Sequence, residues 1–193
     1  VLTGVCWTGL TTGVAVATEA GAGVARPPAG SGDVAYVGVR LSDAELADPT
    51  VDRQLRQLSA TAVIDDRTLA VTARVNGIRF PDGIAYVPGA DKVFVSDESG
   101  GADVVIGAKS HAKRSTIDLG GEAGNTHYDS VSHCVVVAVQ TRNQLVAIDP
   151  ARERIVQRYD LPGSDHPHGF AMDEDGRLAF GGRPVLRIFR PAP

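Results

Sequence analysis

Short apolar runs recur along the chain at one fixed spacing. The triplet Val-Phe-Val at 93–95 is followed 42 residues later by Val-Val-Val at 135–137. Three further triplets, Val-Ile-Asp at 63–65, Val-Ile-Gly at 105–107 and Ala-Ile-Asp at 147–149, keep the same step of 42 residues. A constant period of about 20 to 50 residues indicates an array of similar structural units. We therefore predict that Ile64, Ile106 and Ile148 occupy equivalent places in successive units.

The clearest unit has the pattern of four short strands joined by tight turns. We predict strands at 84–87, 92–97, 103–106 and 112–117, each of the usual length of a strand in a globular protein. The intervening segments 88–91, 100–101 and 107–110 are rich in Gly, Pro, Asp and Ser, which favour chain reversal. Each unit is thus predicted to be an antiparallel meander.

The second strand of the following unit, 134–139, is apolar almost throughout. A strand with one face in water would alternate between apolar and polar residues, so this strand must be covered on both faces. Blades wedged between neighbouring blades provide such cover, whereas a β-sandwich would not require near-identical units. The sequence predicts an all-β fold, a β-propeller of four-stranded antiparallel blades, and 193 residues at 42 per unit allow about three to four of them.

These units resemble the YVTN-repeat β-propeller family, which is related in architecture to the WD-repeat propellers. The likeness is carried by Val93-Phe94-Val95-Ser96-Asp97 and by Ala147-Ile148-Asp149-Pro150, and it extends over about residues 60–189. The resemblance implies a binding scaffold made of repeated blades. It implies little about a specific activity, because propellers of one architecture serve many functions.

Two parts of the chain depart from the repeat. Residues 1–32 are predicted to be a signal-like or irregular segment that includes a Gly/Ala/Pro-rich linker, and blades are expected over 33–193. Within that range, Ser42 and Glu45 have the spacing of a capping box, which predicts a helical insertion at 41–58; an irregular loop is the alternative. The last unit ends after its third strand, so a partial propeller with exposed blade faces and a tendency to self-associate is expected.

The net charge and the length of the apolar runs bear on which partners this protein can have. The formal net charge is −4, which provides no broad positive field for a phosphate backbone, so we expect no nucleic-acid binding. The longest apolar run has six residues, far fewer than a membrane span requires, so no membrane span is expected. The signal-like start favours a periplasmic or secreted location, with the cytoplasm as the alternative.

The residues that could bind a ligand or a metal lie in the connections that enter each blade's innermost strand. In a propeller these connections border the central channel, where ligands commonly bind. They contain a set of polar residues that we predict to line the channel mouth: Asp82, Asn125, His127, Asp165, His166 and His168. Imidazole and carboxylate groups can hold a divalent metal if they converge, which makes His127, His166, His168 and Asp82 the candidate ligands. The alternative is that these side chains only bind backbone groups between blades.

Two classes of function follow from this pattern. The first is a non-enzymatic scaffold that binds a small molecule or a protein at the channel mouth and needs no cofactor. The second is a metal-dependent propeller hydrolase similar to the lactonases, in which channel-mouth residues hold a metal that activates water. The sequence has no nucleophile motif, phosphate loop or zinc signature, so no catalytic residue is assigned.

Overall fold

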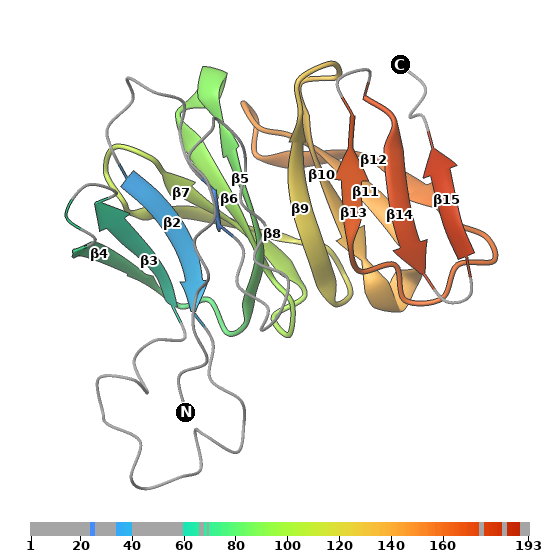
Figure 1. Ribbon diagram of the computed structural model, residues 1–193, viewed down its shortest axis with the longest axis horizontal. Helices are drawn as coiled ribbons and strands as arrows, with labels where there is room; N and C mark the ends of the chain where they lie inside the picture. Colours follow the sequence, from blue (N-terminus) through green and yellow to red (C-terminus); the bar gives the residue numbers. More distant parts are fainter. Residues whose placement is uncertain are drawn as a thin grey trace, which may run out of the picture.

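The chain forms four antiparallel β-sheets that follow one another in sequence order (Figure 1). This computed structural model describes residues 24–25, 34–39, 60–65, 68, 70–173, 176–182 and 185–189. We call the sheets blades 1 to 4. Blade 1 contains β1 (Val24–Ala25), β2 (Val34–Val39), β3 (Ala60–Asp65) and β4 (Val71–Asn76); blade 2 contains β5 (Pro81–Val87), β6 (Lys92–Asp97), β7 (Ala102–Gly107) and β8 (Lys113–Asp118).

The other two blades continue the series. Blade 3 contains β9 (Ala123–Asp129), β10 (Cys134–Val139), β11 (Gln144–Asp149) and β12 (Arg154–Asp160), and blade 4 contains β13 (Phe170–Met172), β14 (Leu178–Gly182) and β15 (Val185–Phe189). Each blade is a meander whose first strand lies innermost, and β5 packs between β1 and β9. Two short 3₁₀ turns, η1 (Pro88–Ala90) and η2 (Gln140–Arg142), close hairpins in blades 2 and 3. The predicted all-β architecture of repeated blades is confirmed.

The 42-residue period has a structural counterpart in the backbone. Ile64, Ile106 and Ile148 lie in β3, β7 and β11, the third strand of their blades, and the pairing with the fourth strand shifts register at each of them. Left-handed backbone positions recur at the same spacing in the hairpins, as in the pairs Asp91 and His133, Gly101 and Asn143, and His111 and Glu153. Equivalent turns therefore repeat along with the apolar strands.

The apolar strands are covered on both faces, as the sequence predicted. On β6, Val93 and Val95 pack with Val63 of blade 1, whereas Phe94 points the other way and packs with Val135 of blade 3. All five of these side chains are fully buried. Alternate residues of one strand thus fill two separate inter-blade cores, which is why the strand has no polar face.

Blade 1 begins earlier than expected. Val24–Ala25 pairs with Tyr36 and Val37 of β2, so the segment 1–32, which we expected to precede the blades, contributes a strand. A strand of only two residues is too short to show a periodic pattern. The helical insertion expected at 41–58 lies outside the described residues.

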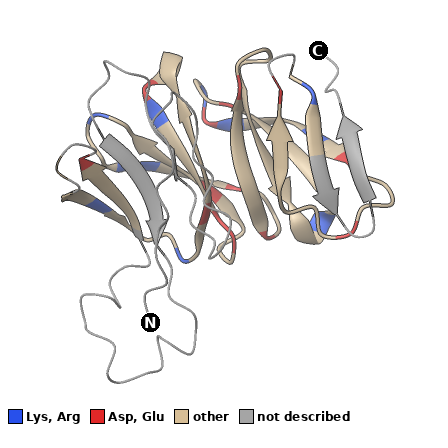
Figure 2. Cartoon of the chain, in the orientation of Figure 1, with Lys and Arg blue, Asp and Glu red and all other residues tan. Residues whose placement is uncertain are grey.

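Charged residues of both signs are interspersed along the strands and hairpins of the blades (Figure 2). Within the described part of the chain, no helix has the length and apolar character needed to cross a membrane.

Candidate functional site

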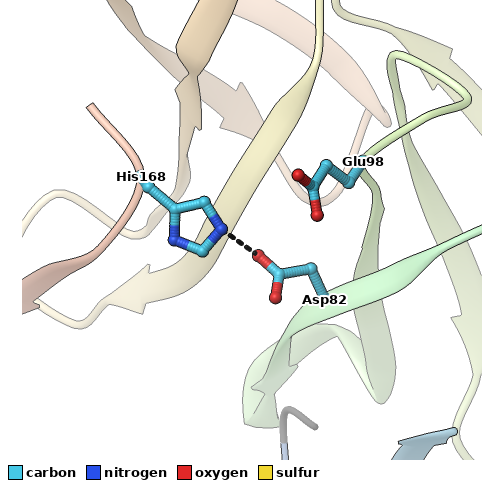
Figure 3. Close-up of side chains that lie close together, drawn as sticks. All are labelled: Asp82, Glu98 and His168. Atoms are coloured by element: carbon cyan, nitrogen blue, oxygen red, sulfur yellow. Dashed lines mark ion pairs between the residues drawn. The ribbon is translucent and has the colours of Figure 1, made fainter. Parts of the chain in front are cut away.

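Three side chains that carry metal-binding or proton-carrying groups converge at one end of the innermost strands. They are Asp82 near the start of β5, Glu98 immediately after β6, and His168 two residues before β13 (Figure 3). Each offers one ligand atom, and these atoms all lie within 4.8 Å of one another. The Nε2 atom of His168 lies 3.3 Å from Oδ2 of Asp82. Residues from blades 2 and 4 therefore meet at a shared site.

Local backbone contacts hold the two acidic residues of blade 2 at this edge. The start of β5 and the end of β6 lie side by side because the two strands are antiparallel. The carboxylate of Asp97 accepts hydrogen bonds from the backbone N–H groups of Phe80, at 2.9 Å, and Gly100, at 3.2 Å. The N–H of Glu98 donates in turn to the carbonyl of Phe80 at 2.9 Å. These bonds fix the entry into β5 against the β6–β7 hairpin.

A glycine in blade 3 allows His168 to reach blade 2. Gly124 follows Ala123, which pairs with Val139 as Pro81 pairs with Asp97 in blade 2, so Gly124 occupies the place of Asp82. A Cβ atom on Gly124 would lie only 2.8 Å from the carbonyl oxygen of His168. That carbonyl accepts a hydrogen bond from the N–H of Asn125 at 3.1 Å. The backbone at His168 thus packs directly on the backbone of β9, and the imidazole of His168 faces Asp82.

The three groups differ in their access to solvent. The side chain of Asp82 is 7% exposed, whereas that of His168 is 47% exposed. Glu98 is partly buried, and its Oε1 accepts a hydrogen bond from Nε2 of Gln140 in blade 3 at 3.3 Å. A buried carboxylate beside an accessible imidazole can bind a charged or polar group that approaches from solvent.

Asn125 contacts the backbone of His168 but is not one of the three clustered residues, and Asp165, His166 and His127 are likewise not among them. Asp165 and His166 contact each other at 2.6 Å on the surface, and the N–H of His166 donates to the side chain of Asn143. The ring of His127 packs edge-on against Phe170, with ring centroids 4.7 Å apart. Burial lowers the pKa of His127, which a hydrogen bond with the backbone of Phe170 partly opposes. Among the described residues, His127 and His166 join no metal-type cluster.

Glu98 was missed by the sequence analysis. It lies in a hairpin between the second and third strands of its blade, whereas the predicted site residues lie in the connections entering the first strand. The antiparallel pairing of β5 with β6 places the end of β6 beside the start of β5. The acidic pair Asp97-Glu98 at the end of an apolar strand was the signal that could have pointed to this residue.

A second buried acid lies between blades 2 and 3. Asp103 in β7 is fully buried, and its Oδ2 accepts a hydrogen bond from the hydroxyl of Thr126 in β9 at 2.9 Å. Burial raises the pKa of Asp103 to about 7, although hydrogen bonds with Thr126 and the backbone of Val95 act in the opposite direction. This group is enclosed by the protein and is a structural rather than a ligand-accessible acid.

A surface hollow of about 450 Å³ opens at the other edge of blades 2 and 3. Its walls include Tyr128, His133, Cys134 and Asp149, and none of the predicted channel-mouth residues lines it. Burial raises the pKa of the Cys134 thiol, so the thiol stays protonated and is a poor nucleophile near neutral pH. Among the described residues the metal-type cluster of Asp82, Glu98 and His168 lies outside this hollow, so the cluster is the candidate site.

Comparison with known proteins supports the fold only. No family model matches the chain, and no curated protein matches it. Among solved structures, the chain is similar to Kuenenia stuttgartiensis hydrazine synthase, with a TM-score of 0.61 and 15% identity over 83% of this chain and 47% of that chain. It is also similar to the dihydro-heme d1 dehydrogenase NirN in complex with DHE, with a TM-score of 0.62 and 17% identity over 82% of this chain and 32% of that chain.

Both structures contain β-propellers, so the chain has a β-propeller fold. It spans less than half the length of either structure. At 15% and 17% identity the similarity gives no evidence about the activity of this chain. The fold gives none either, because proteins of one fold serve many functions.

Proposed function

We propose that this chain is a ligand-binding β-propeller scaffold of the YVTN-repeat kind that binds a small polar molecule at the channel mouth. The observation that carries the proposal is the convergence of Asp82, Glu98 and His168 from separate connections of blades 2 and 4. The 42-residue repeat, with its recurring apolar strands and turns, supports the YVTN-repeat assignment.

The cluster suits recognition of a polar ligand for a physical reason. A carboxylate that is already buried has lost most of its water, so a ligand group that bonds to it pays little further desolvation. The half-exposed imidazole of His168 can donate or accept a hydrogen bond according to its tautomer. Glu98 adds a second acceptor, which favours a ligand that carries hydrogen-bond donors or positive charge.

The test is a ligand screen on the full chain. Protein-observed NMR against small polar compounds should give hits that shift the signals of residues 80–83 and 166–169. Binding should weaken by at least about tenfold in His168→Ala, since a lost hydrogen bond to a charged group costs roughly 1.5–3 kcal/mol. His111→Asn is the matched control, because His111 lies in the β7–β8 hairpin at the opposite edge and Asn tolerates its left-handed backbone.

Two results would contradict the proposal. Hits that map to the hollow around Tyr128 and Cys134 and are indifferent to His168→Ala would place the site elsewhere. Turnover of an ester or lactone by wild-type protein that disappears in His168→Ala would show that the site is catalytic and not a scaffold.

A further inference from the structure

We propose that Asp82, Glu98 and His168 form a binding site for a divalent transition-metal cation of the zinc type. This inference rests on the proposed function, because the cation would be part of what the channel mouth binds. The three ligand atoms come from different connections, and they lie within 4.8 Å of one another without any other histidine or cysteine in the described residues joining them.

The donor set selects the class of metal. One imidazole nitrogen and two carboxylate oxygens are the ligands that zinc and its first-row neighbours accept. Calcium and magnesium prefer sites made entirely of oxygen atoms, so the imidazole of His168 disfavours them. The lack of a thiolate in the cluster likewise disfavours a soft cation such as Cu(I).

The separation of His168 from Asp82 fits two ligands of one cation. Bonds of about 2.0–2.2 Å to a tetrahedral zinc ion place neighbouring ligand atoms roughly 3.4 Å apart. The Nε2 atom of His168 and Oδ2 of Asp82 are 3.3 Å apart. A direct charge-assisted hydrogen bond would be shorter, at about 2.7–2.9 Å. The separation of this pair is therefore compatible with two ligands of one cation, and the ligand atom of Glu98 lies within 4.8 Å of both.

The surroundings of the cluster are those of a supported metal site. Gln140 donates a hydrogen bond to Oε1 of Glu98, which orients that carboxylate as outer partners of metal ligands do. The close contact of Gly124 with the backbone of His168 fixes the base of the imidazole. Asp82 and Glu98 bring two acidic groups close together, and a bound cation would offset their mutual repulsion.

Three protein ligands leave one position of a tetrahedral cation open. The imidazole of His168 is 47% exposed, so the cluster is accessible from the channel mouth. An open position there would let the cation contact the polar ligand of the proposed function directly.

The experiment uses the full chain after removal of metals with a chelator. Titration with zinc chloride followed by calorimetry and elemental analysis should show one saturable site per chain. Titration with cobalt(II) chloride should produce the visible d–d absorption of a four-coordinate ion. His168→Gln and Glu98→Gln should each weaken zinc binding by more than the roughly 10- to 100-fold that loss of a supporting residue costs.

His166→Gln is the matched control. His166 is exposed to a similar extent, at 52% against 47% for His168, and lies two residues away in the same connection, but it pairs with Asp165. Zinc affinity should be unchanged in this variant. Circular dichroism of each variant establishes that it is folded. His168 and Glu98 are not fully buried, so their substitution tests the site without disturbing the buried Asp82.

The outcomes separate this inference from the proposed function. Absence of saturable zinc and cobalt binding, or zinc binding that is undiminished in His168→Gln, overturns the metal site. If the chelator-treated protein still binds polar ligands at residues 80–83 and 166–169, the scaffold function stands without the metal. If zinc binds as expected and the screen finds no ligand, the metal site stands and the scaffold function fails.

Discussion

At the scale of single residues, the most unusual group is the buried acid Asp103. Its side chain has no exposure, and one of its oxygens is bonded to the hydroxyl of Thr126 across the interface between blades 2 and 3. Burial favours the neutral form of a carboxyl group because the charged form loses its hydration. The pKa of Asp103 is accordingly raised from 3.8 to about 7. The folded protein therefore holds a proton at a pH where the unfolded chain has released it.

This difference predicts a stability that falls as the pH rises. Between pH 3.8 and about 7 the folded state binds more protons than the unfolded state, so the free energy of unfolding decreases with pH over this window. The stabilisation is complete below 3.8 and is lost above about 7. Because each pKa unit corresponds to about 1.4 kcal/mol, the whole effect between these two pH values amounts to roughly 4 kcal/mol.

Urea unfolding at about pH 5 and about pH 8 measures this change. Asp103→Asn keeps the shape of the side chain without the titrating proton, so its unfolding free energy should change less between the two pH values than that of the wild type. Equal pH dependence in both proteins would show that Asp103 is charged in the folded state.

At the scale of elements, an ion pair ties a strand of blade 2 to a hairpin of blade 3. Nζ of Lys92 on β6 lies 2.7 Å from Oε1 of Glu153 in the β11–β12 hairpin and donates to the carbonyl of Pro150 at 2.8 Å. Ser115 and Arg114 of β8 bind the same carboxylate. Burial of Glu153 opposes its charged form, but the hydrogen bonds and charge of Lys92, with the bond from Ser115, outweigh it and lower its pKa.

Removing the ammonium group should destabilise the contact between the two blades. The side chains of Lys92 and Glu153 are only 10% and 17% exposed, so Lys92→Met leaves a largely buried carboxylate and the carbonyl of Pro150 with fewer partners. We expect a loss of about 2–4 kcal/mol in the free energy of unfolding, slightly below the usual cost of breaking a fully buried pair because Arg114 remains.

Lys109→Met is the matched control for this prediction. The ammonium group of Lys109 pairs with Asp91 at 3.0 Å, but its side chain is 85% exposed, so solvent screens the pair. Chemical denaturation of both variants should show a loss for Lys92→Met and no measurable loss for Lys109→Met. Similar effects at the two positions would mean that burial does not determine the strength of the inter-blade pair.

At the scale of the whole molecule, the position of each blade depends on how closely the innermost strands approach. Gly83 of β5 packs directly on the backbone of β9, where an added Cβ atom would lie 2.3 Å from the nitrogen of Thr126. The N–H of Gly83 also donates to the hydroxyl of Ser96 at 2.7 Å, which holds β5 within its own blade. Neither strand can move away without opening the apolar core between blades 2 and 3.

Gly83→Ala should therefore separate two blades. The methyl group must displace backbone atoms rather than a flexible side chain, and such overpacking costs about 1–3 kcal/mol and occasionally more. Gly89→Ala is the control, because a Cβ atom at Gly89 meets no atom within 4 Å. Thermal and urea unfolding of the two variants should show destabilisation for Gly83→Ala alone. An Ala at position 83 that is tolerated as well as one at 89 would show that β5 and β9 are not in close contact.

The fold was largely readable from the sequence because its signals are local and repeated. The strands predicted at 92–97 and 103–106 agree with β6 and β7, and Ile64, Ile106 and Ile148 occupy equivalent strands. The apolar strands and turns of each unit lie within 42 consecutive residues. The same pattern then recurs in the next unit, which supports the prediction for both. The two-residue strand β1 escaped prediction because it is too short to carry a pattern.

The candidate site was readable only in part. The sequence pointed to the connections entering the innermost strands, which include Asp82 and His168, but it grouped them with His127, Asp165 and His166 and omitted Glu98. All of blade 3 lies between Asp82 and His168 in the chain. Their contact depends on how blades 2, 3 and 4 pack against one another and on the missing side chain at Gly124. Spacing along the chain carries no information about how the blades pack.

The sequence by itself determined the repeating element of this protein: the period, the four-strand meander, and the strands that must be buried on both faces. These properties follow from residue types over short distances, where alternation, apolar runs and turn residues act on the backbone directly. The tertiary structure alone decided which polar groups meet, namely Asp82 with His168, Asp103 with Thr126, and Lys92 with Glu153. Those pairs depend on how one blade packs against another, and that geometry is set by the sum of many weak contacts rather than by any single motif.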